Sequence, residues 1–153
     1  WDGVRFDTFT YHGAVEYIEK HKPRVLFISF GETDDWAHEN KYKEYLESAL
    51  RTDRLIEQVW DLLQSIPQYR GKTTLLLCTD HGRGDLADWT DHGAETPGSD
   101  RIWAAALGEG VPAKGVVKNT PITQGQIAAT VAALLGLDFN VTSSAIAPPL
   151  SLN

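Results

Sequence analysis

The hydrophobic residues of the chain occur as short runs and as longer stripes with helical spacing. Residues 73–79 form an apolar run with little alternation, which is typical of a strand covered on both faces, as in a parallel sheet. Residues 24–30 and 101–107 are two further apolar runs, and each predicts a strand. On this interpretation Cys78, the one cysteine of the chain, lies buried in the middle strand.

Three helices are predicted around these strands. The first is capped by Asp7, Thr8 or Thr10 and ends at about His21, shortly before Pro23. The second covers about 41–65, where apolar residues recur at helical spacing. The third follows residues 123–126, whose Thr-Gln-Gly-Gln sequence has the spacing of a capping box, and it ends at Gly136.

The remaining segments are richer in polar residues, and the order of the elements indicates the fold class. Residues 31–40 are expected to form a polar loop after the first strand, and the Ser/Pro-rich tail contains a glycosylation sequon at 140–142. The order helix, strand, helix, strand, strand, helix favours crossover connections. The predicted fold is therefore α/β, with a mostly parallel sheet and helices on both faces.

Composition narrows the class of protein only slightly. The 153 residues suffice for one domain with a hydrophobic core, and 42% hydrophobic and 23% charged residues are ordinary for a globular protein. The formal net charge of −7 argues against nucleic acid as a partner, and no apolar run approaches the length of a membrane span. Because the chain begins at Trp1 and contains no methionine, we expect residues 1–153 to be the carboxyl-terminal portion of a longer domain whose amino-terminal portion is absent.

Five residues of metal-binding type lie in the loops around the predicted strands. Asp34 and His38 follow the first strand, Asp80 and His81 follow the second, and His92 lies in the loop before the third. Ligands of open α/β sheets bind beyond the carboxyl ends of the strands, so we expect these loops to meet. Carboxylate and imidazole together suit zinc or a similar divalent ion. Five ligands exceed one tetrahedral zinc site, which favours two metals, with a further ligand and the nucleophile elsewhere.

Neighbouring residues in the same loops have simpler interpretations. Asp35 competes with Asp34 as a ligand, but the four-residue offset to the following histidine favours Asp34. Arg83 is interpreted as an exposed loop residue rather than a phosphate contact. Asp91 is interpreted as a solvated or capping residue, and Trp89 as a packing residue that could also line a substrate pocket.

Taken together, these motifs resemble the alkaline phosphatase superfamily. The matching pattern is Asp-x-x-x-His at 34–38, Asp-His-Gly at 80–82 after an apolar strand, and a later His-Gly at 92–93. The resemblance covers residues 24–136. It implies an alkaline phosphatase-like α/β domain, of which this chain is the carboxyl-terminal part.

The resemblance also implies how the ligands are shared. Asp34, His38 and His92 would hold one divalent metal, and Asp80 and His81 would hold a second. The family completes the second site with an Asp and a Ser or Thr nucleophile from its amino-terminal half, and nothing in this chain matches those elements. We therefore assign no catalytic nucleophile here. Zinc is the expected metal, with manganese as the alternative.

The expected function is that of a metal-dependent hydrolase of small phosphate esters, to which this chain supplies metal ligands. By the resemblance, a periplasmic or secreted location is expected rather than a cytoplasmic one, and the fragment alone is expected to be inactive. Three alternatives stay open: a sulfatase-like enzyme, a phosphoglycerate mutase-like enzyme, and a non-catalytic metal-binding fragment. The sequence does not specify the oligomeric state.

Overall fold

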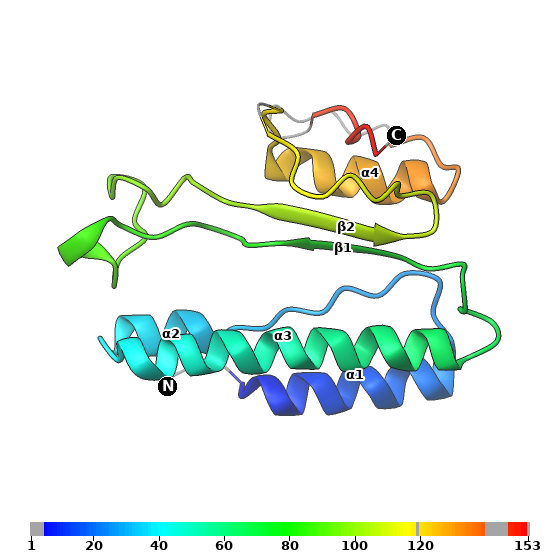
Figure 1. The fold of residues 1–153 in the computed structure, drawn as a ribbon, viewed down its shortest axis with the longest axis horizontal. Helices are drawn as coiled ribbons and strands as arrows, with labels where there is room; N and C mark the ends of the chain where they lie inside the picture. The colour runs from blue at the N-terminus through cyan, green and yellow to red at the C-terminus, as the bar shows by residue number, and fades with distance from the viewer. Residues whose placement is uncertain (1–4, 119, 140–146, 153) are drawn as a thin grey trace. The chain divides into compact units, whose positions relative to one another are not determined.

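The computed structural model describes residues 5–118, 120–139 and 147–152. The predicted sequon lies outside these residues. The main helices and strands are α1 (Asp7–His21), α2 (Glu32–His38), α3 (Tyr42–Ser65), β1 (Thr74–Cys78), β2 (Ala104–Gly108) and α4 (Ile127–Leu134) (Figure 1). Two short 3-10 helices, η1 (Leu86–Asp88) and η2 (Gln124–Gln126), complete the set.

The chain forms two compact units, which are interleaved in sequence. The first contains α1, α2 and α3 together with the loop 81–102. The second contains β1, residues 79–80, β2 and the segments that follow, including α4. All of the contacts described below are made within one or the other unit.

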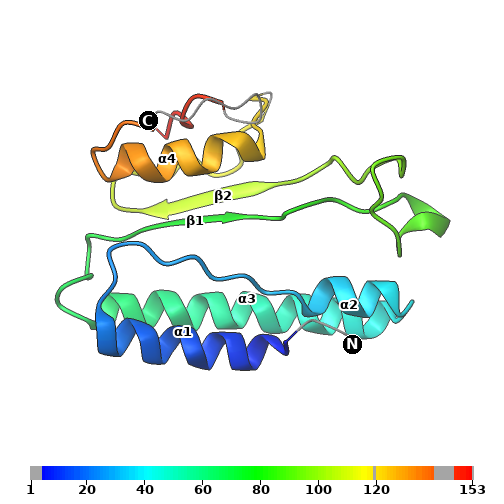
Figure 2. The same cartoon turned by 180° about the vertical axis from the view of Figure 1, so that it is seen from behind.

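The first unit is built on two long helices, as predicted. In both views α1 runs alongside α3 (Figures 1 and 2), and Ile18 of α1 and Val59 of α3 are buried. The end of α1 and both bounds of α3 agree with the sequence prediction, but α1 begins with Asp7 in its first turn and has Phe6, not one of the three predicted residues, at its N-cap. Among the described residues, no helix is both long enough and apolar enough to cross a membrane.

The polar segment 31–40 contains a helix that was not predicted. Its seven residues, α2, begin with Glu32 after Gly31. The local sequence offers no capping side chain at Gly31, but Asp7 of α1 accepts hydrogen bonds from the backbone N–H groups of Gly31 (2.8 Å) and Glu32 (3.3 Å). A remote carboxylate therefore stabilises the start of α2, which is a tertiary effect.

The predicted strand at 24–30 is wrong for this structure. The segment is extended but takes part in no strand pairing among the described residues. Val25 is 51% exposed and Phe27 is 87% exposed, whereas Ile28 and Phe30 are partly covered. A strand requires a neighbour for its backbone hydrogen bonds, and within the described part of the chain the sheet contains only β1 and β2.

The second unit contains a two-stranded antiparallel sheet. β1 and β2 pair with Thr74 opposite Gly108 and Cys78 opposite Ala104. The strand at 73–79 is confirmed, whereas β2 begins later than the predicted 101–107. Parallel neighbours need a crossover connection, usually a helix, but the connection between β1 and β2 contains only a short 3-10 turn and returns antiparallel. The α/β content is confirmed, and a mostly parallel sheet with helices on both faces stays a prediction.

Two further expectations in the second unit have opposite outcomes. Cys78 is exposed at the end of β1, not buried as predicted. The capping box is confirmed, because the backbone N–H of Thr123 donates to the Gln126 side chain at 2.9 Å and the reciprocal bond is also present. Residues 147–152 pack on α4, where the backbone N–H of Leu150 donates to Thr130 Oγ1 at 2.8 Å.

Candidate metal centre

Helix α2 places two of the predicted ligands on one face. Asp34 and His38 are four residues apart, so their side chains lie one above the other on the helix surface. His38 Nε2 is 3.4 Å from Asp34 Oδ2. The orientation of this face depends on the buried network at the start of α2, where Glu32 also forms an ion pair of 2.8 Å with Arg51 of α3.

The loop 81–102 carries the other histidines of the site and folds tightly on itself. The backbone N–H of Gly82 donates to the carbonyl oxygen of Ser99 at 2.7 Å. A Cβ atom at Gly82 would overlap the carbonyl oxygens of Gly98 and Arg101. Glycine is therefore required at this position by close backbone approach rather than by an unusual torsion angle.

Asp91 shapes the backbone next to His92. Its Oδ1 atom accepts hydrogen bonds from the backbone N–H groups of His92 (2.6 Å) and Gly93 (3.0 Å). The hydrogen bonds from Gly93 and His92 hold the pKa of Asp91 below its usual value. Asp91 is thus a local hydrogen-bond acceptor that orients the histidine, in agreement with its interpretation as a capping residue.

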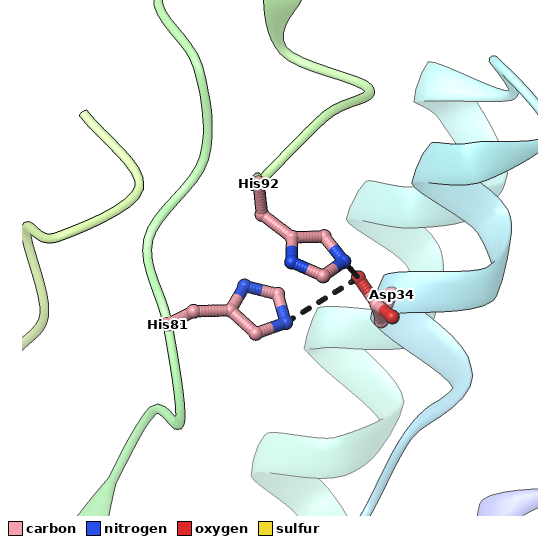
Figure 3. Close-up of side chains that lie close together, drawn as sticks. All are labelled: Asp34, His81 and His92. Atoms are coloured by element: carbon pink, nitrogen blue, oxygen red, sulfur yellow. Dashed lines mark ion pairs between the residues drawn. The ribbon is translucent and has the colours of Figure 1, made fainter. Parts of the chain in front are cut away.

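Asp34, His81 and His92 converge in space (Figure 3). Each offers one ligand atom, and these atoms all lie within 4.8 Å of one another. The His81 and His92 Nε2 atoms are 3.7 and 3.6 Å from the same oxygen, Asp34 Oδ1. The two imidazole rings stack, with 3.7 Å between their centroids. His38 adjoins this group, because its Nε2 is 2.9 Å from His92 Nε2.

The hydrogen bonding of His81 indicates which of its nitrogens is available. Its Nδ1 atom lies 2.8 Å from the carbonyl oxygen of Gly82. A carbonyl oxygen can only accept, so Nδ1 carries a proton, and Nε2 is the ring nitrogen that faces Asp34. This is the arrangement of metal-binding histidines, whose second nitrogen commonly donates to a backbone carbonyl.

The spacing of these atoms fits a small divalent ion. Tetrahedral zinc with bonds of about 2.1 Å separates its ligand atoms by about 3.4 Å. In the group of three, His92 and His81 lie 3.6 and 3.7 Å from Asp34 Oδ1, and His38 lies beside it, 3.4 Å from Asp34 Oδ2 and 2.9 Å from His92 Nε2. One carboxylate and three imidazoles are also the nitrogen and oxygen donors that zinc accepts. Four of the five predicted ligands are thus brought together, and their division between two metals stays a prediction.

Asp80 is the fifth predicted ligand and belongs to the second unit. Its backbone carbonyl oxygen accepts a hydrogen bond from Gln124 Nε2 at 2.6 Å, and the same amide reaches the carbonyl oxygen of Thr79 at 3.1 Å. Gln124 lies in η2, so the capping segment at the start of α4 holds the end of β1. The role of Asp80 as a metal ligand stays a prediction.

Arg83 is the residue of the site that sequence reasoning undervalued. It was expected to be an exposed loop residue, but its side chain is only 14% exposed and forms an ion pair with Asp34 Oδ1. Its guanidinium also donates to the backbone carbonyl oxygens of Asp34 (3.2 Å) and Trp89 (3.4 Å). An Arg directly after the Asp-His-Gly motif was the available signal, but sequence alone does not show which way the side chain turns.

Aromatic side chains pack between the loop 81–102 and α3. The Trp89 ring meets Tyr42 and Tyr45 of α3 edge-on, with ring centroids 5.1 and 5.6 Å apart. These contacts support Trp89 as a packing residue that joins the loop to α3. Asp35, the competing ligand, has a carboxyl oxygen buried without a hydrogen-bond partner, and burial raises its pKa. Its neighbour Asp34 is the one that reaches the cluster.

Comparison with known proteins agrees with a metal-dependent site. A family model described as the metalloenzyme superfamily matches residues 10–138. GPI ethanolamine phosphate transferase 1 of Emericella nidulans is 28% identical over 143 residues, which cover 78% of this chain and 15% of that protein. The Aspergillus oryzae protein of the same name is 27% identical, with 78% and 14% covered.

A mammalian relative shows a similar level of identity. The GPI ethanolamine phosphate transferase 1 of Mus musculus is 24% identical over an alignment of 184 positions, which covers 99% of this chain and 19% of that protein. The chain thus spans less than a fifth of the length of these relatives. No solved structure matches it significantly.

Proposed function

Because this chain belongs to the metalloenzyme superfamily, we propose that it supplies metal ligands to an enzyme that transfers a phosphate ester group. The family match confirms the resemblance to alkaline phosphatase-like enzymes. The observation that carries the proposal is the convergence of Asp34, His81 and His92 from α2 and from two parts of the loop.

The four clustered residues have distinct tasks in this proposal. Asp34 supplies the negative charge and, with His38, His81 and His92, the ligand atoms for a divalent ion such as zinc. The carbonyl oxygen of Gly82 keeps His81 in the tautomer whose Nε2 can bind. A bound metal supplies Lewis-acid stabilisation of a phosphoryl oxygen and lowers the pKa of an attacking hydroxyl.

The names of the relatives favour transfer over the hydrolysis expected from sequence. All three are ethanolamine phosphate transferases. In both transfer and hydrolysis an oxygen nucleophile attacks phosphorus. The nucleophile is an alcohol in transfer and water in hydrolysis. We therefore extend the proposal to a phosphoester such as ethanolamine phosphate as the transferred group, in preference to a sulfate ester or a phosphoglycerate.

Metal binding can be tested on the 153-residue chain by calorimetric titration with zinc. The wild type is expected to bind zinc, and Asp34→Asn to bind it at least about tenfold more weakly, since it loses a charged ligand. Asp85→Asn is the matched control, because Asp85 is an acid of the same loop that forms an exposed pair with Arg101. Equal zinc affinity in the wild type and Asp34→Asn would contradict the assigned site.

The reaction itself is tested in the longer protein of which we propose this chain to be a part. The zinc-loaded protein is assayed separately with a phosphodiester, a phosphomonoester and a sulfate ester. Each assay is run with and without an alcohol as the acceptor. The proposal expects phosphoester turnover that depends on Asp34 and a product in which the alcohol carries the phosphate group. Turnover of the sulfate ester alone would favour the sulfatase-like alternative, and no turnover with tight zinc binding would favour a non-catalytic metal site.

A further inference from the structure

Arg83 holds the same carboxylate oxygen that faces the histidines. Its Nη2 forms an ion pair with Asp34 Oδ1 and also donates to the Asp34 carbonyl oxygen at 3.2 Å. The Nε2 atoms of His81 and His92 face Oδ1 at 3.7 and 3.6 Å. One carboxylate oxygen is therefore both the acceptor for a guanidinium and the point on which two imidazoles converge.

Asp34 Oδ1 cannot easily keep its ion pair with Arg83 and bind a divalent metal at the same time. A guanidinium in contact with Oδ1 places a positive charge within a few ångströms of the position between the three ligand atoms. Like charges at such separations repel strongly, and the repulsion grows where solvent is partly excluded. The Arg83 side chain is 14% exposed and that of Asp34 is 33% exposed, so bulk water screens the pair only in part.

We propose that Arg83 is a built-in counter-cation that competes with the divalent metal for Asp34 and so sets the metal affinity of the site. This inference rests on the proposed function. In the metal-free protein, Arg83 neutralises a partly buried carboxylate that would otherwise be uncompensated. When metal binds, the guanidinium leaves Oδ1, while the Trp89 carbonyl oxygen, 3.4 Å from its Nη1, remains as an acceptor. Arg83 is a positioning residue for Asp34.

The same loop contains a second Arg–Asp pair that serves as a comparison. Arg101 and Asp85 are 3.1 Å apart, but their side chains are 67% and 59% exposed. Exposed pairs of this kind contribute little to stability. The side chains of Arg101 and Asp85 are joined to each other by two hydrogen bonds of 3.3 and 3.1 Å.

The test is a calorimetric zinc titration of the 153-residue chain at constant pH and ionic strength. Arg83→Gln is expected to bind zinc at least about tenfold more tightly than the wild type, because the competing charge is gone. Arg83→Lys keeps the charge and is expected to stay within about threefold of the wild type. Arg101→Gln, the matched control, should bind zinc like the wild type.

Thermal melting gives a second readout that does not depend on the binding isotherm. Metal-free Arg83→Gln should melt at a lower temperature than the metal-free wild type, because Asp34 loses its partner. Zinc should raise the melting temperature of Arg83→Gln by more than it raises that of the wild type. The proposed competition would be overturned if Arg83→Gln bound zinc no more tightly than the wild type. It would also be overturned if Arg83→Lys gained as much zinc affinity as Arg83→Gln. Failure of the wild type and every variant to bind zinc would instead refute the proposed function itself, on which the competition depends.

Discussion

Asp7 and Glu32 cap each other's helices. The backbone N–H of Asp7 in the first turn of α1 donates to Glu32 Oε1 at 2.8 Å, while Asp7 Oδ1 accepts from the backbone of Gly31 and Glu32. Both acids are buried, with 3% and 5% of their surface exposed. Their remaining oxygens are satisfied from α3, by Thr52 Oγ1 to Asp7 at 3.0 Å and by Arg51 to Glu32 at 2.8 Å.

We predict that Asp7→Ala lowers the free energy of unfolding by about 2–4 kcal/mol, because it removes the cap of α2 and leaves buried donors unpaired. It should also weaken zinc binding, since α2 carries Asp34 and His38. Urea denaturation measures the first effect and calorimetry the second. Glu16→Ala is the control, because Glu16 forms only an exposed pair with Lys20. Equal stability of the two variants would contradict the capping role.

Gly82→Ala is expected to disrupt the loop that holds His81. The added methyl group would collide with backbone carbonyl oxygens of Gly98 and Arg101, which cannot move without shifting the loop. We expect a loss of about 1–3 kcal/mol in unfolding free energy, together with weaker zinc binding. Gly13→Ala in α1 is the control: its Cβ meets no atom within 4 Å, and it should gain about 0.5–1 kcal/mol. Unchanged stability and zinc affinity in Gly82→Ala would show that the loop tolerates the shift.

We expect Asp80→Ala to abolish the phosphoester turnover proposed above, with little change in unfolding free energy. The hydrogen bond that Gln124 makes to residue 80 uses the backbone carbonyl oxygen, so it survives the substitution. Steady-state kinetics with saturating zinc tests the first part, and thermal melting the second. Asp61→Ala changes an exposed acid on α3 and should leave both unaffected. Normal turnover in Asp80→Ala would remove Asp80 from the ligand set.

Tyr69 is expected to give a pH dependence at the alkaline end. Burial raises its pKa above the ordinary value of 10.0, and its hydroxyl donates to the Pro23 carbonyl oxygen at 2.7 Å. The unfolded chain therefore ionises first, so this contribution to stability is full below pH 10 and is lost as the pH rises through the folded pKa.

We expect Tyr69→Phe to cost about 0.5–1.5 kcal/mol at neutral pH through the lost hydrogen bond. Above pH 10, the free energy of unfolding of Tyr69→Phe should decrease less with rising pH than that of the wild type. Urea denaturation at a series of pH values makes this measurement. Tyr17→Phe, at a tyrosine with 47% exposure, is the control. Parallel stability curves for the wild type and Tyr69→Phe would mean that the buried hydroxyl plays no such part.

The sequence by itself determined the long helices, the strand at 73–79, the capping box and the residue types of the site. These features are local: helical spacing of apolar residues, a proline after His21 and the Thr123–Gln126 spacing each act within a few residues. The Asp-x-x-x-His and Asp-His-Gly motifs also predicted the superfamily correctly. Four of the five predicted ligands meet, because they lie in segments that pack within one unit.

Only the tertiary structure decided the rest, because the interactions concerned join residues far apart in the chain. Helix α2 depends on Asp7, 25 residues before Glu32. The direction of β2 depends on a connection with only a short 3-10 turn, whose length alone did not distinguish a crossover from a return. Arg83 reaches Asp34 across 49 residues, and a side chain that is long and charged has no local pattern that indicates its partner.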